Sequence, residues 1–155
     1  MTPEFARVAA ENSGDGFKSR SGQNRQARDG EAGNFRILIV EDEYLTALSV
    51  RYALERERFE ILGVVASAAE ALAAVERDRP DLVLMDVRLS GQVDGIDAAL
   101  ELYRRFGVRC VFATAHVDLS TRARAAPARP MGWLSKPYSD KQLLRTLEEA
   151  CSEFE

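Results

Sequence analysis

Carboxylate side chains follow two apolar runs of this sequence. Glu41 and Asp42 come directly after the run 37–40, and Asp86 ends a second run that begins at Leu82. Because like charges that lie close together repel each other, such a cluster titrates upward unless a cation neutralises it. The cation that suits an all-oxygen site with positions left for water is Mg²⁺. These three residues therefore predict a Mg²⁺ site suited to phosphate chemistry.

Two further polar residues, Thr114 and Lys136, follow apolar runs nearer the end of the chain. In a parallel α/β sheet the carboxyl ends of the strands open into one crevice, so these side chains are expected near Asp86. An aspartate can attack a phosphoryl group and form an aspartyl phosphate. Because such transfer needs cations on the equatorial oxygens, we expect Lys136 and the metal to supply positive charge and Thr114 to supply a hydrogen bond.

Five apolar runs alternate with stretches of helical periodicity. Continuously apolar runs are typical of a parallel sheet covered on both faces, and their alternation with helices indicates a doubly wound α/β domain. Ser67 with Glu70 and Ser139 with Gln142 fit capping boxes, and Asp94 can cap the helix that follows it. The expected strands are 36–40, 61–65, 82–86, 109–113 and 132–135, and the expected helices lie near 43–56, 68–77, 95–106 and 140–153.

The segment 118–130 is the least regular part of this pattern. It contains Pro127 and Pro130 among many Arg and Ala residues. Proline breaks helices and biases the preceding residue away from helical geometry. We therefore expect a short or irregular fourth helix of one or two turns near 118–125, followed by an irregular loop.

Length and composition narrow the class of protein. The 155 residues, of which 46% are hydrophobic, suit about one domain with a real core. The net charge of −4 argues against nucleic acid as a partner, and no apolar stretch is long enough for a membrane span.

Cys110 and Cys151 lie in apolar contexts and are expected to be buried free thiols in a reducing cytoplasm. Residues 1–34 are polar and rich in Gly, Ser and Arg, which predicts a tail or linker before a domain at 35–155.

Over about residues 35–155 the chain resembles the response-regulator receiver domain of two-component signalling. The resemblance rests on the segments 37–43, 82–89, 94–95 and 112–115 and on Lys136-Pro137. It implies a flavodoxin-like sheet with strand order 2-1-3-4-5. It also implies that Asp86 accepts a phosphoryl group from a phosphohistidine on a sensor histidine kinase.

The same resemblance implies roles for the residues around Asp86. Glu41, Asp42, Asp86 and the backbone carbonyl of Arg88 are the implied Mg²⁺ ligands. The implied phosphoryl contacts are Lys136, Thr114 and the backbone of Ala115, and the bond between Lys136 and Pro137 is implied to be cis.

The segment Phe112-Ala113-Thr114-Ala115-His116 resembles a subclass whose fourth strand ends in Phe-Ala-Thr-Gly-Tyr. Such receivers commonly stand alone and work with kinases of the HWE type, although this chain departs from the motif at Ala115 and His116. Trp133 stands where the family has a switch aromatic, usually Tyr or Phe. His116 and Arg88 occupy positions where the family tunes the phosphoryl lifetime.

We therefore expect a single-domain response regulator, with self-catalysed phosphotransfer and dephosphorylation but no classical enzyme activity. Its expected partners are a sensor kinase or a histidine phosphotransferase protein and a downstream protein, and it is a monomer or a phosphorylation-dependent dimer. One alternative is a pseudo-receiver that never phosphorylates. Another is a Mg²⁺-dependent phosphatase of the haloacid-dehalogenase type, but there Asp-x-Asp follows the first strand, whereas Val87 and Arg88 follow Asp86 here.

Overall fold

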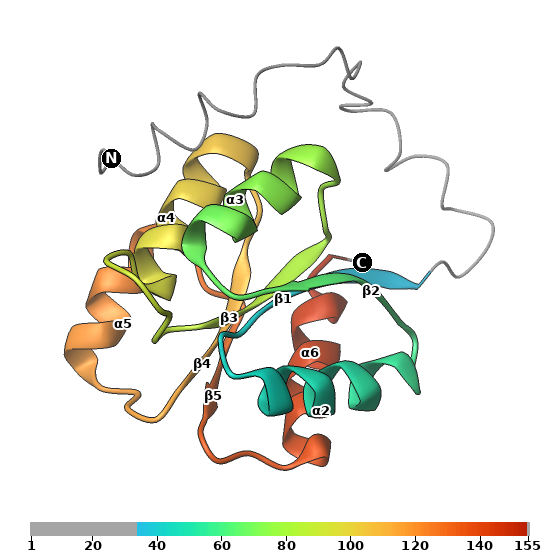
Figure 1. The fold of residues 1–155 in the computed structure, drawn as a ribbon. Coiled ribbons are helices and arrows are strands. Elements are labelled where there is room, and N and C mark those ends of the chain that lie inside the picture. Colours follow the sequence, from blue (N-terminus) through green and yellow to red (C-terminus); the bar gives the residue numbers. More distant parts are fainter. Residues whose placement is uncertain (1–33, 155) are drawn as a thin grey trace.

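A computed structural model describes residues 34–154, and the tail or linker predicted at 1–34 lies, but for its last residue, outside that range. Five parallel strands form one sheet in the order β2-β1-β3-β4-β5 (Figure 1), which confirms the predicted flavodoxin-like topology. The strands are β1 (Phe35–Val40), β2 (Phe59–Val65), β3 (Leu82–Asp86), β4 (Cys110–Thr114) and β5 (Gly132–Ser135).

Helices cover both faces of the sheet. In Figure 1, α3 and α4 lie against one face, and α2 and α6 lie against the other. The shorter α5 packs beside α4. The bounds are α2 (Tyr44–Glu55), α3 (Ala68–Arg77), α4 (Gly95–Phe106), α5 (Leu119–Ala125) and α6 (Asp140–Ser152).

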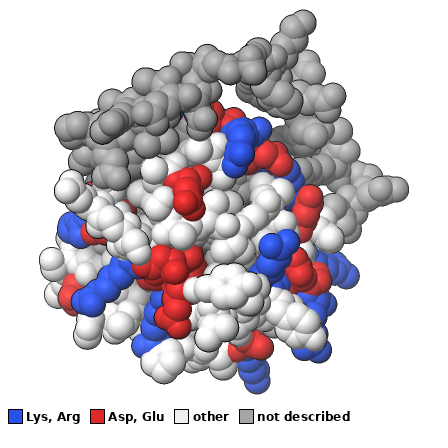
Figure 2. Space-filling view, viewed as in Figure 1, with Lys and Arg blue, Asp and Glu red and all other residues white. Residues whose placement is uncertain are grey.

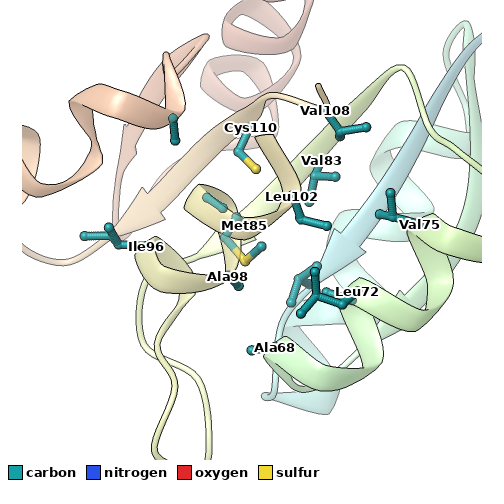
Figure 3. Close-up of a cluster of buried hydrophobic side chains, with 14 of the residues drawn as sticks. Ala68, Leu72, Val75, Val83, Met85, Ile96, Ala98, Leu102, Val108 and Cys110 are labelled. Carbon is teal, nitrogen blue, oxygen red and sulfur yellow. The ribbon is translucent and has the colours of Figure 1, made fainter. Parts of the chain in front are cut away.

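Alternate residues of each central strand enter two separate cores. On the α3–α4 face, Leu72 and Leu102 pack with Val83 (Figure 3), and the neighbouring Leu82 points to the opposite core with Leu143 of α6. This two-sided burial explains why β1, β3 and β4 read as unbroken apolar runs. It also leaves the carboxyl ends of the strands as the place where polar side chains can gather.

Two of the three predicted helix caps form as expected. Asp94 accepts from the Asp97 amide, and Ser139 and Gln142 form a complete capping box. At α3 the capping box is only half formed. The Ser67 hydroxyl accepts from the Glu70 amide, but the Glu70 carboxylate accepts from the Ala66 amide instead of the amide of Ser67.

The fourth helix is short and lies within the predicted range 118–125, which confirms the expectation. Asp118 caps α5 by accepting from the Thr121 amide, and the helix then continues for seven residues. Both prolines come after it, and Pro127 lies in a single 3₁₀ turn at Ala126–Ala128, a position that proline tolerates. The predicted irregular loop is therefore mostly a 3₁₀ turn, which ends at Arg129 with a positive φ of 52°.

None of the helices within residues 34–154 is both long enough and apolar enough to cross a bilayer.

Candidate functional site

Three carboxylates meet at the carboxyl edge of the sheet. Glu41 and Asp42 follow β1 and Asp86 ends β3, and the two strands are hydrogen-bonded neighbours with Val40 opposite Met85. One carboxylate oxygen of each residue lies within 4.8 Å of the others. Glu41 and Asp86 are buried, with 7% and 6% exposure, whereas Asp42 is exposed. The sequence-predicted acidic cluster is therefore assembled in space.

Lys136 holds two of these carboxylates from the end of β5. Its Nζ donates to Glu41 Oε2 at 3.0 Å and lies 3.1 Å from Asp86 Oδ2. Its backbone amide donates to the Thr114 carbonyl, and its bond to Pro137 is cis. Burial lowers the pKa of Lys136, but the hydrogen bonds to Glu41 and Asp86 outweigh burial, so the pKa lies above its ordinary value. The side chain is therefore a fixed cation between two anions.

Backbone amides hold the remaining oxygens of the two buried carboxylates. Glu41 Oε1 accepts from the Glu43 amide at 3.0 Å, and Asp86 Oδ1 accepts from the Arg88 amide at 3.2 Å. Burial raises the pKa of Glu41 above its ordinary value, and the charge of Asp86 adds to the rise. The Glu43 amide and Lys136 act in the opposite direction without cancelling it. The ionised form of Glu41 is thus disfavoured by its surroundings, and an additional cation nearby would stabilise it.

Thr114 ends β4 next to Asp86, whose register partner is Ala113. The Thr114 side chain is 6% exposed, and its Oγ1 accepts from the His116 amide at 3.2 Å. Ala115 and His116 are exposed at the rim of the site. The Arg88 side chain is also exposed. These rim residues, Ala115, His116 and Arg88, follow the ends of β3 and β4, and the Arg88 backbone amide contacts Asp86.

Trp133 lies on β5, three residues before Lys136 in the sequence. Its strand partner is Phe112, and the two rings stack with centroids 4.8 Å apart. The Arg122 guanidinium of α5 lies over the indole, 5.4 Å from its centroid. Because residues 112 and 114 point to the same face of β4, the indole lies on the same face as Thr114. The aromatic position is thus connected to α5 on one side and to β4 on the other.

The sequence analysis missed three contacts around the cluster. The Ser90 hydroxyl donates to Asp42 Oδ2 at 2.8 Å. The Gly95 amide donates to the Val87 carbonyl, and its Cα lies so close to the Asp86 backbone that a Cβ would be 1.9 Å from that carbonyl oxygen. Arg124 of α5 pairs with the capping Asp94 at 2.9 Å. Of these, only Gly95 carried a signal, because the glycine directly follows the helix cap.

The donor set fits a hard divalent cation. All three side chains offer carboxylate oxygens, and the exposed Asp42 leaves a side open to water, the combination that Mg²⁺ favours. Soft metals prefer sulfur or imidazole, and both cysteines are buried elsewhere in the fold. A cation here, together with Lys136, would place two positive groups beside the Asp86 carboxylate. An anionic phosphoryl group is the kind of ligand that such a pocket attracts.

A doubly wound five-stranded sheet with acidic residues and a lysine at its carboxyl edge defines a flavodoxin-like domain of the signal-receiver class. The chain belongs to the response regulator receiver domain family, whose model matches residues 37–148. The family is that of two-component signalling, which confirms the resemblance seen in the sequence.

Individual relatives agree with this membership. The chain is 38% identical over 119 residues to the transcriptional regulatory protein PdtaR of Mycobacterium tuberculosis, covering 77% of this chain and 58% of PdtaR. It is 32% identical to the phyllosphere-induced regulator PhyR of Methylorubrum extorquens, covering 74% of this chain and 42% of PhyR. The chain thus spans only about half the length of these relatives.

Solved structures extend the comparison to the fold. The receiver domain of a modulated diguanylate cyclase from Desulfovibrio desulfuricans superposes with a TM-score of 0.70 at 34% identity, covering 77% of this chain and 95% of that one. A CheY-like receiver domain protein from Methanospirillum hungatei gives a TM-score of 0.71 at 27% identity, covering 77% of this chain and 95% of that one.

Proposed function

We propose that this protein is a response regulator that accepts a phosphoryl group onto Asp86 in a Mg²⁺-dependent reaction and signals through protein contacts. The observation that carries the proposal is the Lys136 ammonium between Glu41 and Asp86, with Asp42 completing an acidic cluster. An aspartate in such surroundings is a nucleophile with positive charge placed for the incoming phosphoryl oxygens.

Each residue has a definite part in the proposed reaction. An Asp86 oxygen forms the new bond to phosphorus while the bond between phosphorus and the donor histidine breaks, leaving the electron pair on that nitrogen. Lys136 neutralises phosphoryl oxygens, and the Thr114 hydroxyl and the Ala115 amide donate hydrogen bonds to them. Glu41, Asp42, Asp86 and the Arg88 carbonyl would hold Mg²⁺, which when bound supplies further positive charge.

The rim residues are proposed to set how long the phosphoryl group persists and how it is sensed. His116 and Arg88 are exposed beside the site, where they can control the approach of the hydrolytic water. Trp133, stacked between Phe112 and Arg122, is proposed to respond to Thr114 and pass the change to α5. This role differs from simple packing because it requires the indole to move on phosphorylation.

A protein donor is supported by an exposed apolar stripe on α2. Tyr44 and Leu45 are 73% and 74% exposed, and Leu48 and Tyr52 continue the same side of the helix. The stripe starts one residue after Glu43, so a protein that covers it also reaches the carboxylates. Large apolar side chains that are exposed together on one side of a helix favour a contact with another protein. We propose a sensor histidine kinase, of the HWE type, or a histidine phosphotransferase protein as that donor.

The downstream partner is proposed to bind the side formed by β4, α5, β5 and α6. A groove there is lined by Trp133, Tyr138 and Arg145. Figure 2 shows Lys and Arg interspersed with Asp and Glu on the visible face, so that face has no continuous basic surface of the kind that nucleic acid requires. We propose a cytoplasmic protein that is a monomer or a phosphorylation-dependent dimer, with residues 35–155 as its receiver domain.

The test is the intact mass of the full chain after incubation with acetyl phosphate and Mg²⁺. We expect one phosphoryl adduct, which disappears with chelator and in Asp86→Asn but persists in Asp140→Asn, an exposed aspartate on α6. An adduct in Asp86→Asn would refute the assignment of the acceptor. No adduct in the wild-type protein, with no Mg²⁺ binding, would favour the pseudo-receiver, and turnover of a small phosphate ester would favour a phosphatase.

A further inference from the structure

The three carboxylates of the cluster are not held equally. Both oxygens of Glu41 and both oxygens of Asp86 have partners in Lys136 and in backbone amides. Asp42 is exposed, and its carboxylate has one hydrogen-bond partner among residues 34–154, the Ser90 hydroxyl at 2.8 Å. The orientation of the third carboxylate therefore depends on a single side chain.

Ser90 reaches Asp42 from a distant part of the sequence. It lies in the loop between β3 and α4, 48 residues from Asp42. The loop turns at Gly91, whose φ of +99° suits a residue without a side chain. The start of this loop follows Asp86 directly and its end is fixed by the Asp94 cap. The Ser90 contact thus joins the loop after the proposed acceptor to the end of β1.

An unheld Asp42 side chain would turn away from the cluster. Glu41 and Asp86 repel it, and water solvates it on the open side. A hydroxyl that donates to Oδ2 restrains this rotation and leaves Oδ1 free for another ligand. Groups that orient metal-binding carboxylates in this way typically change metal affinity by about 10–100-fold when they are removed.

We propose that Ser90 is a positioning residue for the divalent-cation site, which it serves by orienting Asp42. The inference rests on the proposed function, because it assumes that the acidic cluster binds Mg²⁺. Ser90 itself contacts neither the acceptor nor the cation in this scheme. Because Asp42 is solvent-exposed, we expect an effect at the low end of the usual range for such residues, about tenfold in Mg²⁺ affinity.

The test is calorimetric titration of Mg²⁺ into the full, unphosphorylated chain. We expect Ser90→Ala to raise the dissociation constant for Mg²⁺ by about tenfold. Ser90→Thr, which keeps the hydroxyl, should stay within about twofold of the wild-type protein. Ser152→Ala is the matched control, because that serine is also exposed and hydrogen-bonded but lies at the end of α6. Unfolding midpoints of all variants in chelator should agree, which separates orientation from folding.

Three results would overturn the proposal, and they differ in what else they affect. If the wild-type protein binds Mg²⁺ and Ser90→Ala binds it equally well or more tightly, Ser90 does not position Asp42 and the proposed function stands. If the wild-type protein binds no Mg²⁺, the proposed function fails together with the role of Ser90. Equal loss in Ser90→Ala and Ser90→Thr would also refute the role, because the hydroxyl would then not be the cause.

Discussion

Replacing Gly95 with alanine should destabilise the protein, although alanine is the better helix former. A Cβ at this position would lie 1.9 Å from the Asp86 carbonyl oxygen and 3.0 Å from Met85 Cγ. Ordinary contact begins at 3.4 Å, so helix α4 and the end of β3 must separate by about 1.5 Å. The hydrogen bond from the Gly95 amide to the Val87 carbonyl, now 2.8 Å, cannot survive that shift.

The magnitude follows from three opposing effects. Overpacking costs about 1–3 kcal/mol, and the lost hydrogen bond costs about 1 kcal/mol. Alanine returns at most about 1 kcal/mol of helix propensity. We expect a net loss of about 1–3 kcal/mol, a large part of the roughly 5–15 kcal/mol that stabilises a typical domain.

Urea unfolding measures this loss, with Gly63→Ala as the matched control. A Cβ at Gly63 meets only Leu38 Cδ1 at 4.0 Å, so that variant should change stability by less than about 0.5 kcal/mol. Acetyl phosphate labelling should also slow in Gly95→Ala, because the displaced backbone carries Asp86. If Gly95→Ala is as stable as Gly63→Ala and is labelled at the wild-type rate, the close approach of α4 to Asp86, on which this prediction rests, is refuted.

Four other predictions follow from the described contacts. Leu45→Asp should reduce phosphotransfer from a protein donor at least tenfold while acetyl phosphate labelling stays within about twofold; equal loss of both would argue against a docking role. Arg122→Gln removes a guanidinium from Trp133, the sole tryptophan, so its emission should change, and an unchanged spectrum would contradict the contact. Burial raises the pKa of the Cys110 thiol, so a thiol reagent at pH 8 should label it in urea but not in native buffer, and native labelling would show that the core opens. The raised pKa of Lys136 means that the folded state holds this proton more tightly than the unfolded state does. The resulting stabilisation is complete below pH 10.5 and is lost as the pH rises through the raised pKa. Lys136→Met should therefore reduce the loss of unfolding free energy at alkaline pH, and an unchanged slope of unfolding free energy against pH would refute this.

Much of the fold was predictable because the sheet is buried on both sides. β3 matches the predicted bounds, since Leu82 to Met85 are all buried and read as one apolar run. β2 begins at Phe59, two residues before the prediction, because the charged Glu60 interrupts the pattern at the edge of the sheet. The short α5 was predictable because Pro127 and Pro130 limit the helix to the residues before them, whereas the cap at Asp118 was not anticipated.

The acidic cluster was predictable for a topological reason, whereas its supporting contacts were not. Parallel strands bring their carboxyl ends together, so Glu41, Asp42 and Asp86 could be placed from their positions after apolar runs. The Ser90 hydroxyl has no such rule, because its contact depends on the path of one loop. The same holds for the half-formed capping box at Ser67, where a small local displacement decides which amide Glu70 accepts from.

The acidic pocket also makes the stability of the fold depend on the cations in the solution. Glu41 and Asp86 are buried beside each other with one lysine between them, so the cation-free protein keeps an excess of negative charge where water cannot disperse it. Whatever binds this place only in the folded chain adds to stability by mass action. With the Mg²⁺ binding proposed above, the protein would be less stable when magnesium is scarce and more stable when magnesium is plentiful. Its resistance to unfolding and proteolysis would then depend on the Mg²⁺ concentration as well as on the chain.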